Sequence, residues 1–131
     1  MATIFSKIIS REIPAQIVAE NDEYIAFLDI NPLAKGHTLV VPKVETDYIF
    51  GLQPETLSGL MLFAQRVAKA IDACAYAKRV GVAVIGLEVP HAHIHLVPIN
   101  GLHDIEFSKE KLKLSAEELS AVADQIRSNF I

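Results

Sequence analysis

The chain has 131 residues, of which 51% are hydrophobic and 21% charged, so it fits one globular domain and is too apolar for a disordered tail. The formal net charge of -4 and the scattered lysines argue against binding to nucleic acid. Cys74 is the single cysteine, so no internal disulfide can form, and no apolar run reaches the roughly 18 residues of a membrane span. The first ten residues have no signal-peptide pattern. We expect a soluble cytoplasmic protein without a membrane or nucleic-acid partner.

The first third of the chain is rich in predicted strands. The segments "AQIVAEN" (15–21) and "EYIAFLD" (23–29) predict two strands joined by a polar hairpin turn. A loop follows in "INPLAKG" (30–36), marked by an Asn-Pro pair and a glycine. The segment "HTLVVP" (37–42) predicts a third strand that ends at its proline.

A long helix is predicted from Pro54 to about Tyr76, where apolar residues recur at i, i+3, i+4 and i+7. A second stripe on this helix is also small or apolar. It indicates either a subunit contact or a helix buried deeply in its own core. The stripe consists of Gly59, Phe63, Ala70, Ala73 and Ala77.

The last elements are a strand and a second helix. The segment "RVGVAVIG" (79–86) is apolar on both faces, which predicts a central strand. Ser115 and Glu118 have capping-box spacing at the start of a C-terminal helix. We therefore expect one α+β domain over residues 1–131, with an antiparallel sheet of about five strands, one long helix and a C-terminal helix. Residues 1–100 hold the main motifs and 101–131 form a C-terminal extension.

The segment "VPHAHIHLVP" (89–98) carries three histidines at alternate positions. In a strand, His91, His93 and His95 point to one face, with attachment points roughly 6.6 Å apart, while the alternate residues point to the other. The alternate residues Ala92, Ile94 and Leu96 are apolar and should pack against the helices. Three titratable rings then lie side by side on the opposite face.

Three explanations compete for this row. Incidental placement is the best explanation for a lone histidine but not for three on one face. A metal site is disfavoured, because three rings along an extended line cannot easily converge on one ion and no second cysteine or carboxylate pair is nearby. The third explanation is attack on phosphorus by a neutral imidazole, with flanking rings as hydrogen-bond donors. The attacking ring then needs its other nitrogen held by an acceptor.

The segment "HAHIHLVP" resembles the signature of the histidine triad family, His-φ-His-φ-His-φ-φ with φ apolar. The segments "FLDINPLAKGHTLVVPK" (27–43) and "IFSKIISREIPAQIVAEND" (4–22) also resemble the family, so the likeness runs from residue 4 to about 98. The resemblance implies a homodimer whose protomers join their sheets. It also implies an enzyme without a cofactor that hydrolyses or transfers a nucleoside monophosphate, with a purine nucleotide derivative as substrate.

The resemblance also implies roles for four histidines. His93 attacks the α-phosphorus to give a nucleotidyl-histidine, which water then cleaves. His91 orients His93 through its backbone carbonyl, and His95 binds a phosphoryl oxygen or assists the leaving group. His37 matches the fourth histidine of the family and would support His91 from the neighbouring strand.

Three more residues match substrate-binding positions of the family. Asp29 corresponds to the acidic residue that holds the ribose hydroxyls, and its alternative role is to open the Asn-Pro turn. Ile8 and Ile25 would enclose the base, although apolar residues are more often part of the core.

Two departures from the family pattern affect the expected chemistry. Thr3 and Ser6 stand where many relatives have two zinc-binding cysteines, so we predict no structural zinc. The segment "VGVAVIGLEVPH" (80–91) lacks the usual polar loop, and Gly86-Leu87 replaces a Gly-Gln pair that contacts phosphate. Glu88 would repel a polyphosphate and favour an amine leaving group.

Two alternatives to this enzyme stay open. The altered loop before the triad is compatible with a nucleotide-sensing or protein-interaction module that has lost turnover. A metal-dependent activity is the third possibility. The sequence assigns no role to His103, and residues 101–131 are candidates for tuning specificity because the C-terminal part of relatives often reaches the partner's active site.

Overall fold

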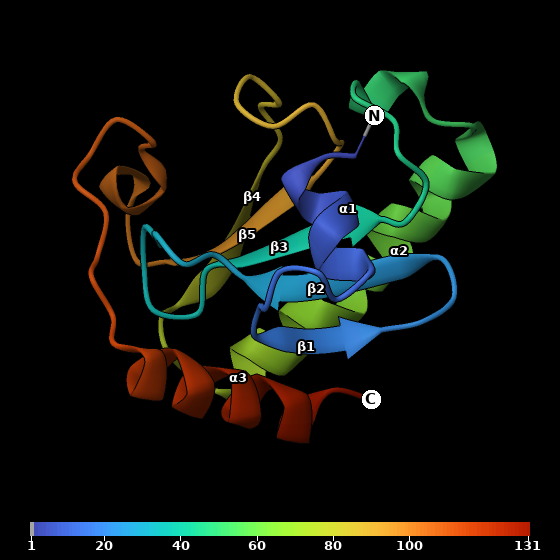
Figure 1. The fold of residues 1–131 in the computed structure, drawn as a ribbon. Helices are drawn as coiled ribbons and strands as arrows, with labels where there is room; N and C mark the ends of the chain where they lie inside the picture. The colour runs from blue at the N-terminus through green and yellow to red at the C-terminus, as the bar shows by residue number, and fades with distance from the viewer. Residues whose placement is uncertain (1) are drawn as a thin grey trace.

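The computed structural model describes residues 2–131 and contains a five-stranded antiparallel sheet with helices on both faces (Figure 1). This confirms the expected α+β fold with a long helix and a C-terminal helix. Along the sheet, the strands are β1 (Ile17–Glu20), β2 (Tyr24–Leu28), β3 (Thr38–Pro42), β5 (Ile94–Ile99) and β4 (Arg79–Ala83). Two 3₁₀ helices, Ile49–Gly51 and Leu102–Ile105, lie in the connections.

The first hairpin forms as predicted, because its turn satisfies its own backbone. The side-chain oxygen of Asn21 accepts hydrogen bonds from the backbone N–H groups of Glu23 and Tyr24. Such an Asx turn is a common use of asparagine between strands. Every residue of β2 and β3 is buried, since both strands are paired on both sides and covered on both faces.

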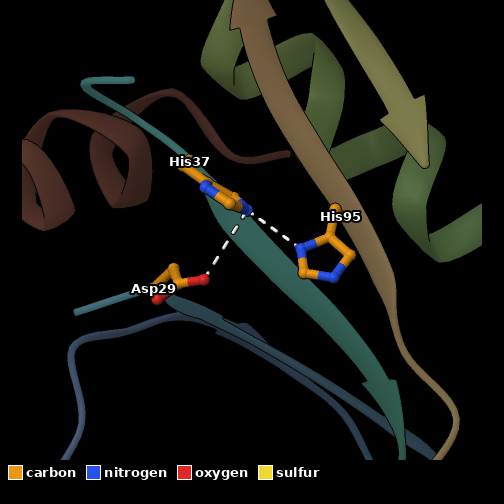
Figure 2. A group of neighbouring side chains, drawn as sticks. All are labelled: Asp29, His37 and His95. Atoms are coloured by element: carbon orange, nitrogen blue, oxygen red, sulfur yellow. Dashed lines mark hydrogen bonds and ion pairs between the residues drawn. The ribbon is translucent and has the colours of Figure 1, made fainter. Parts of the chain in front are cut away.

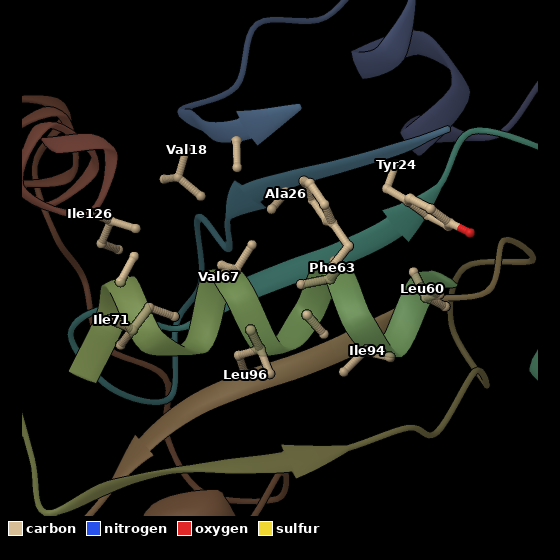
Figure 3. Packing of buried hydrophobic residues seen from close by; sticks show 14 of the residues in the cluster. Val18, Tyr24, Ala26, Leu60, Phe63, Val67, Ile71, Ile94, Leu96 and Ile126 are labelled. Carbon is tan, nitrogen blue, oxygen red and sulfur yellow. The ribbon is translucent and has the colours of Figure 1, made fainter. Parts of the chain in front are cut away.

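Helices α2 (Pro54–Ala73) and α3 (Ala116–Asn129) cover one face of the sheet and form the larger core (Figure 3). Pro54 opens α2, and the predicted capping box of Ser115 and Glu118 opens α3. This core includes Leu60, Val67, Ile71, Ile94, Leu96 and Ile126, each at most 1% exposed. Burying each such side chain contributes about 1.5–3 kcal/mol.

The second stripe of α2 faces its own fold over most of its length. Phe63 and Ala70 are buried in the larger core, and Gly59 lies against the hydroxyl of Tyr24, where any side chain would collide with the ring. Of the two interpretations of this stripe, deep burial therefore applies to Phe63 and Ala70, whereas Gly59 is half-buried.

Helix α1 (Ile4–Ile9) lies on the opposite face and was not predicted. Its six residues are too few to show a helical period. Phe5 and Ile8 pack from α1 onto β2 and β3 in a smaller core. The strand residues of that core are Ile25, Phe27, Leu39 and Val41. This helix therefore covers part of the sheet face toward which the histidines point.

Strand β4 lies at the edge of the sheet, and the prediction of a central strand was wrong. Within residues 2–131 it pairs with β5 alone, and Val82 is 52% exposed. An apolar pattern on both faces of a strand indicates that both faces are buried, but it does not show whether residues of the same chain or of a second chain bury them.

None of the helices formed by residues 2–131 has both the length and the apolar character needed to cross a membrane. The cytoplasmic location expected from the sequence stays a prediction.

Candidate active site

The three triad histidines lie at the start of β5 and in the segment before it. His95 belongs to β5, which begins only at Ile94, so His91 and His93 precede the strand that was predicted to hold all three. The predicted alternation is nevertheless present. The apolar partners Ala92, Ile94 and Leu96 join the larger core, and the three imidazoles lie on the other side, at most 8% exposed.

His93 is held in one tautomer by the backbone. Its Nδ1 lies 2.7 Å from the carbonyl oxygen of His91, which confirms the hydrogen bond expected from the resemblance. A carbonyl can only accept, so Nδ1 carries the proton and Nε2 carries the lone pair. Within residues 2–131 Nε2 of His93 has no hydrogen-bond partner. Every fully buried side-chain nitrogen in these residues does have a partner, so Nε2 is not fully buried. The lone pair of His93 is therefore accessible from the adjacent cavity.

His91 is fully buried and fixed at both ring nitrogens. Its Nε2 donates to the carbonyl oxygen of Pro42 at 2.8 Å, so its Nδ1 accepts from the hydroxyl of Thr3, also at 2.8 Å. Thr3 also caps α1 by accepting a hydrogen bond from the backbone of Ser6. The ring of Phe5 packs edge-on against His91 and His93, with centroid distances of 5.8 and 5.0 Å. Helix α1 thus holds the orienting histidine in place.

A second chain of hydrogen bonds fixes His37 and His95. The backbone N–H of Leu33 donates to Nδ1 of His37 at 3.0 Å, so Nε2 of neutral His37 carries the proton. That Nε2 lies 3.0 Å from Nδ1 of His95, which must accept (Figure 2). The remaining proton of His95 is therefore on Nε2. This series of hydrogen bonds, from Leu33 through His37 to His95, is called the His37 relay below.

His37 supports His95, and the prediction that it supports His91 was wrong. The strand register explains the difference, since β3 and β5 are antiparallel and Thr38 is opposite Leu96. Leu39 is opposite His95, so His37, two residues earlier on the same face, is a diagonal neighbour of His95, whereas His91 lies at the other end of β3, near Pro42. Gly36, with φ of 95° in the left-handed region, turns the chain into β3 just before His37.

Burial keeps the rings of His37, His93 and His95 neutral at pH 7. Desolvation, with a smaller contribution from the neighbouring imidazole, lowers the pKa of His37 to about 3 and that of His95 to about 4. The pKa of His93 is also lowered, mainly by desolvation, although its bond to the carbonyl of His91 and the charge of Asp29 oppose the shift. A neutral His93 is the form that can act as a nucleophile.

Asp29 opens the Asn-Pro turn and also lines the cavity, and its role in holding the ribose hydroxyls stays a prediction. Its Oδ1 accepts a hydrogen bond from the backbone of Asn31 at 2.9 Å, so it does open the turn. Its Oδ2 lies 3.7 Å from Nε2 of His37, its side chain is 22% exposed, and it lines the cavity (Figure 2). Burial raises the pKa of this carboxyl above its usual value.

Asp29, His37 and His95 also have the composition of a metal site, with candidate ligand atoms within 4.8 Å of one another. The hydrogen bonds argue against that use. Nε2 of His37 would have to be a ligand through its lone pair, but the N–H of Leu33 forces this nitrogen to carry a proton. The group is better described as a carboxylate beside the His37 relay.

Thr3 and Ser6, the residues that the family resemblance matches to zinc-binding cysteines, place two hydroxyl groups side by side. The hydroxyl of Ser6 lies 3.1 Å from that of Thr3 and donates to Glu45. Thr3 in turn donates to His91. These side chains form a hydrogen-bonded cluster at the start of α1.

A cavity of about 530 Å³ opens beside His93 and His95. Most of its wall is apolar, and its polar lining includes Asp29, Asn31, His37 and Glu88. The apolar lining includes Ile4, Phe5, Ile8, Ile13, Phe27, Leu39, Ile85, Leu87, Val89 and Phe107. Its size and its few convergent polar groups suit a small-molecule ligand.

Of the two isoleucines expected at the base, Ile8 lines the cavity but Ile25 does not. Ile25 is opposite Val41 in the sheet, two residue pairs from Phe27, and it is completely buried beneath α1. Ile25 is thus a core residue, and Phe27 takes the position at the cavity. Glu88 is exposed and lines the cavity.

Four residues at the site were not predicted to act there: Thr3, Phe5, Phe107 and Lys111. Phe107 packs edge-on against His95, with 4.6 Å between ring centroids, and both Phe107 and Lys111 line the cavity. The backbone of Leu112 donates to the carbonyl of Pro32, which holds this segment beside the Asp29 loop. No local pattern shows such a return of the chain, so the sequence carried no signal for these contacts.

Comparison with known proteins identifies the family. The model of the HIT domain matches residues 10–102. The chain belongs to the HIT family. Among HIT relatives, the adenosine 5'-monophosphoramidase hnt1 of Schizosaccharomyces pombe is 32% identical, with 99% of each chain covered. The adenosine 5'-monophosphoramidase HNT1 of Saccharomyces cerevisiae is 39% identical over 74% of this chain and 62% of its own.

Solved HIT structures agree with the fold. A Hit-like protein involved in cell-cycle regulation from Bartonella henselae superposes with a TM-score of 0.85 at 33% identity, covering 98% of this chain and 96% of its own. A zinc-bound histidine triad family protein from Mycobacterium smegmatis superposes with a TM-score of 0.80 at 27% identity, covering 98% and 93%.

Proposed function

We propose that this HIT protein hydrolyses, or transfers a nucleotide from, a nucleoside phosphoramidate or related conjugate, through a covalent bond between His93 and the α-phosphorus. The observation that carries the proposal is the distribution of protons. His93 presents a lone pair to the cavity, while His95 presents an N–H. A nucleophile beside a hydrogen-bond donor is what substitution at an anionic phosphorus requires.

The proposed reaction has two steps. Nε2 of His93 attacks phosphorus, the P–N bond breaks with its electron pair on the leaving nitrogen, and that nitrogen takes a proton from water. The Nε2–H of His95 donates to a phosphoryl oxygen, and the carbonyl of His91 stabilises the positive charge on the bonded imidazole. Water then attacks phosphorus, releasing the nucleoside monophosphate and His93. The proton lost by this water balances the one gained by the amine.

The cavity supplies the proposed binding groups. Asp29 accepts hydrogen bonds from the ribose hydroxyls, and the apolar wall that includes Ile8 and Phe27 encloses a purine base. Glu88 at the cavity disfavours a polyphosphate and favours an amine leaving group. The adenosine 5'-monophosphoramidase names of the two yeast relatives support this choice of substrate.

A quench experiment tests the covalent step. A His95→Ala variant incubated with adenosine phosphoramidate should gain the mass of one adenylyl group, which is AMP less one water, through an acid-labile bond, because loss of the donor slows turnover of the intermediate. The His93→Ala protein should gain nothing in intact-mass spectrometry. Turnover by His93→Ala at the wild-type rate would refute the mechanism, and equal turnover of ADP and the phosphoramidate would refute the leaving-group preference.

One observation favours a second function, a nucleotide-sensing or protein-interaction module. The cavity wall before the triad consists of Ile85, Gly86, Leu87, Glu88 and Val89 and therefore offers no side-chain amide to a phosphate. Submillimolar AMP binding in calorimetry, together with wild-type turnover no faster than that of His93→Ala, would favour this function over hydrolysis.

We also infer that the protein is a homodimer joined through β4. The free edge of β4 carries Val82 and continues into Val84 and Ile85, which are 52%, 40% and 46% exposed. On α2, Met61 and Leu62 are exposed as well. An apolar edge strand of this kind favours pairing with a second copy.

A further inference from the structure

Lys111 carries the one positive charge among the described residues that line the cavity. The same lining holds the carboxyl groups of Asp29 and Glu88, and its two histidines with strongly lowered pKa, His37 and His95, are neutral. A bound nucleotide therefore brings an anionic phosphate into a site with two acidic groups and one cation. Without Lys111, the fixed charges would only repel it.

The ammonium group of Lys111 is positioned by the backbone. Its Nζ donates to the carbonyl oxygens of Phe107, at 2.5 Å, and Lys109, at 3.3 Å. An ammonium has three N–H donors, so one remains for a ligand. No carboxylate within residues 2–131 forms an ion pair with Lys111, so its charge is not neutralised inside the protein.

Lys111 lies at the histidine end of the cavity. The ring of Phe107, whose carbonyl holds the ammonium, packs against His95. The charge of Lys111 also adds to the lowering of the pKa of His37 and offsets part of the rise that burial causes in the pKa of Asp29. The ammonium is therefore near the donor that faces a phosphoryl group in the proposed reaction.

We propose that Lys111 binds the anionic phosphate of the substrate and makes the site select nucleotides over nucleosides. This inference rests on the proposed function and deepens it, because it assigns the phosphate contact to the C-terminal extension of the same protomer. The extension replaces the side-chain amides that the Gly86-Leu87 segment lacks. Charge-assisted hydrogen bonds of this kind are stronger than neutral ones.

Calorimetry with AMP and with adenosine tests the inference. The Lys111→Met variant keeps the length of the side chain but loses the charge, and it should bind AMP about tenfold more weakly than the wild type while binding adenosine equally well. Lys111→Arg should keep most of the preference for AMP. Lys113→Met is the matched control, because Lys113 is exposed, lies outside the cavity and belongs to the same segment.

The outcomes separate the inference from the function on which it rests. Wild-type protein that binds AMP no more tightly than adenosine would overturn both. If Lys111→Met keeps the wild-type preference for AMP over adenosine, the inference alone is overturned. Equal losses of affinity for AMP and for adenosine would also overturn it, because they would indicate that Lys111 contacts the nucleoside. Thermal unfolding of each variant would show that the comparison is made between folded proteins.

Discussion

Thr3 is the outermost residue in the hydrogen-bonded path to the proposed nucleophile. Its hydroxyl donates to His91, the carbonyl of His91 accepts from His93, and the lone pair of His93 faces the cavity. Among the groups that fix these protons, the Thr3 hydroxyl is a side chain that can be removed without changing the triad. It therefore allows a test of whether proton placement controls the reaction.

Replacing Thr3 with valine should leave Nδ1 of buried His91 without a donor, at a cost of about 1–3 kcal/mol. We expect kcat/KM for adenosine phosphoramidate to fall about tenfold as His91 and its carbonyl shift. Imidazole ¹⁵N NMR should show that His93 no longer populates a single tautomer. Thr3→Ser keeps the hydroxyl and should restore both properties. Identical spectra and kinetics for Thr3→Val and the wild type would contradict a role for the hydrogen bond between Thr3 and His91.

At the scale of individual residues, features set by local sequence rules were predicted correctly, whereas contacts between residues far apart in the sequence were not. Alternation placed the imidazoles opposite the apolar residues, and the family pattern predicted the bond from His93 to the carbonyl of His91. The partner of His37 and the position of Ile25 were wrong, because both depend on the strand register. The contacts of Lys111 depend on the path of the chain after β5, which no local pattern encodes.

Among the secondary-structure elements, those with several periods in sequence were predicted. The strands of the first hairpin, β3, α2 and α3 all formed where apolar spacing and turn residues indicated. Helix α1 is too short for its helical period to show in the sequence. Strand β4 was predicted to be central because both its faces are apolar, and this pattern is the same whether residues of its own chain or of a second chain cover the strand. The exposed apolar surface of β4 is the physical basis for the proposed dimer.

A lysine in β4 should therefore weaken that dimer. We expect sedimentation velocity at tens of micromolar to show a wild-type dimer and a Val82→Lys protein shifted toward monomer, because the new charge would be buried at the strand edge. Val44 is 54% exposed and lies outside β4, so Val44→Lys serves as the control and should sediment like the wild type. A wild-type monomer at this concentration would contradict the assembly.

At the scale of the whole molecule, the buried neutral histidines link stability to pH. In the unfolded chain they take up protons below a pKa of about 6.5, whereas in the fold the pKa of His37 is about 3 and that of His95 about 4. Between these limits the unfolded state binds more protons, so stability is fully present above pH 6.5 and is lost as the pH falls.

The free energy of unfolding should accordingly decrease by up to about 1.4 kcal/mol per pH unit for each of these histidines between pH 6 and pH 4. Urea unfolding at a series of pH values measures this slope. Removing one of the two groups, in His37→Gln, should make the slope shallower. Equal slopes in wild type and His37→Gln would contradict the linkage.

Main-chain atoms fix most of the proton positions at this site. The N–H of Leu33 sets His37 and, through it, His95, while the carbonyls of Pro42 and His91 set His91 and His93. Side-chain substitutions at Leu33 leave its N–H in place, and only proline would delete it. The direction of the His37 relay is consequently inherited with the fold, so neighbouring positions can vary to fit new substrates without reversing which ring attacks and which ring donates.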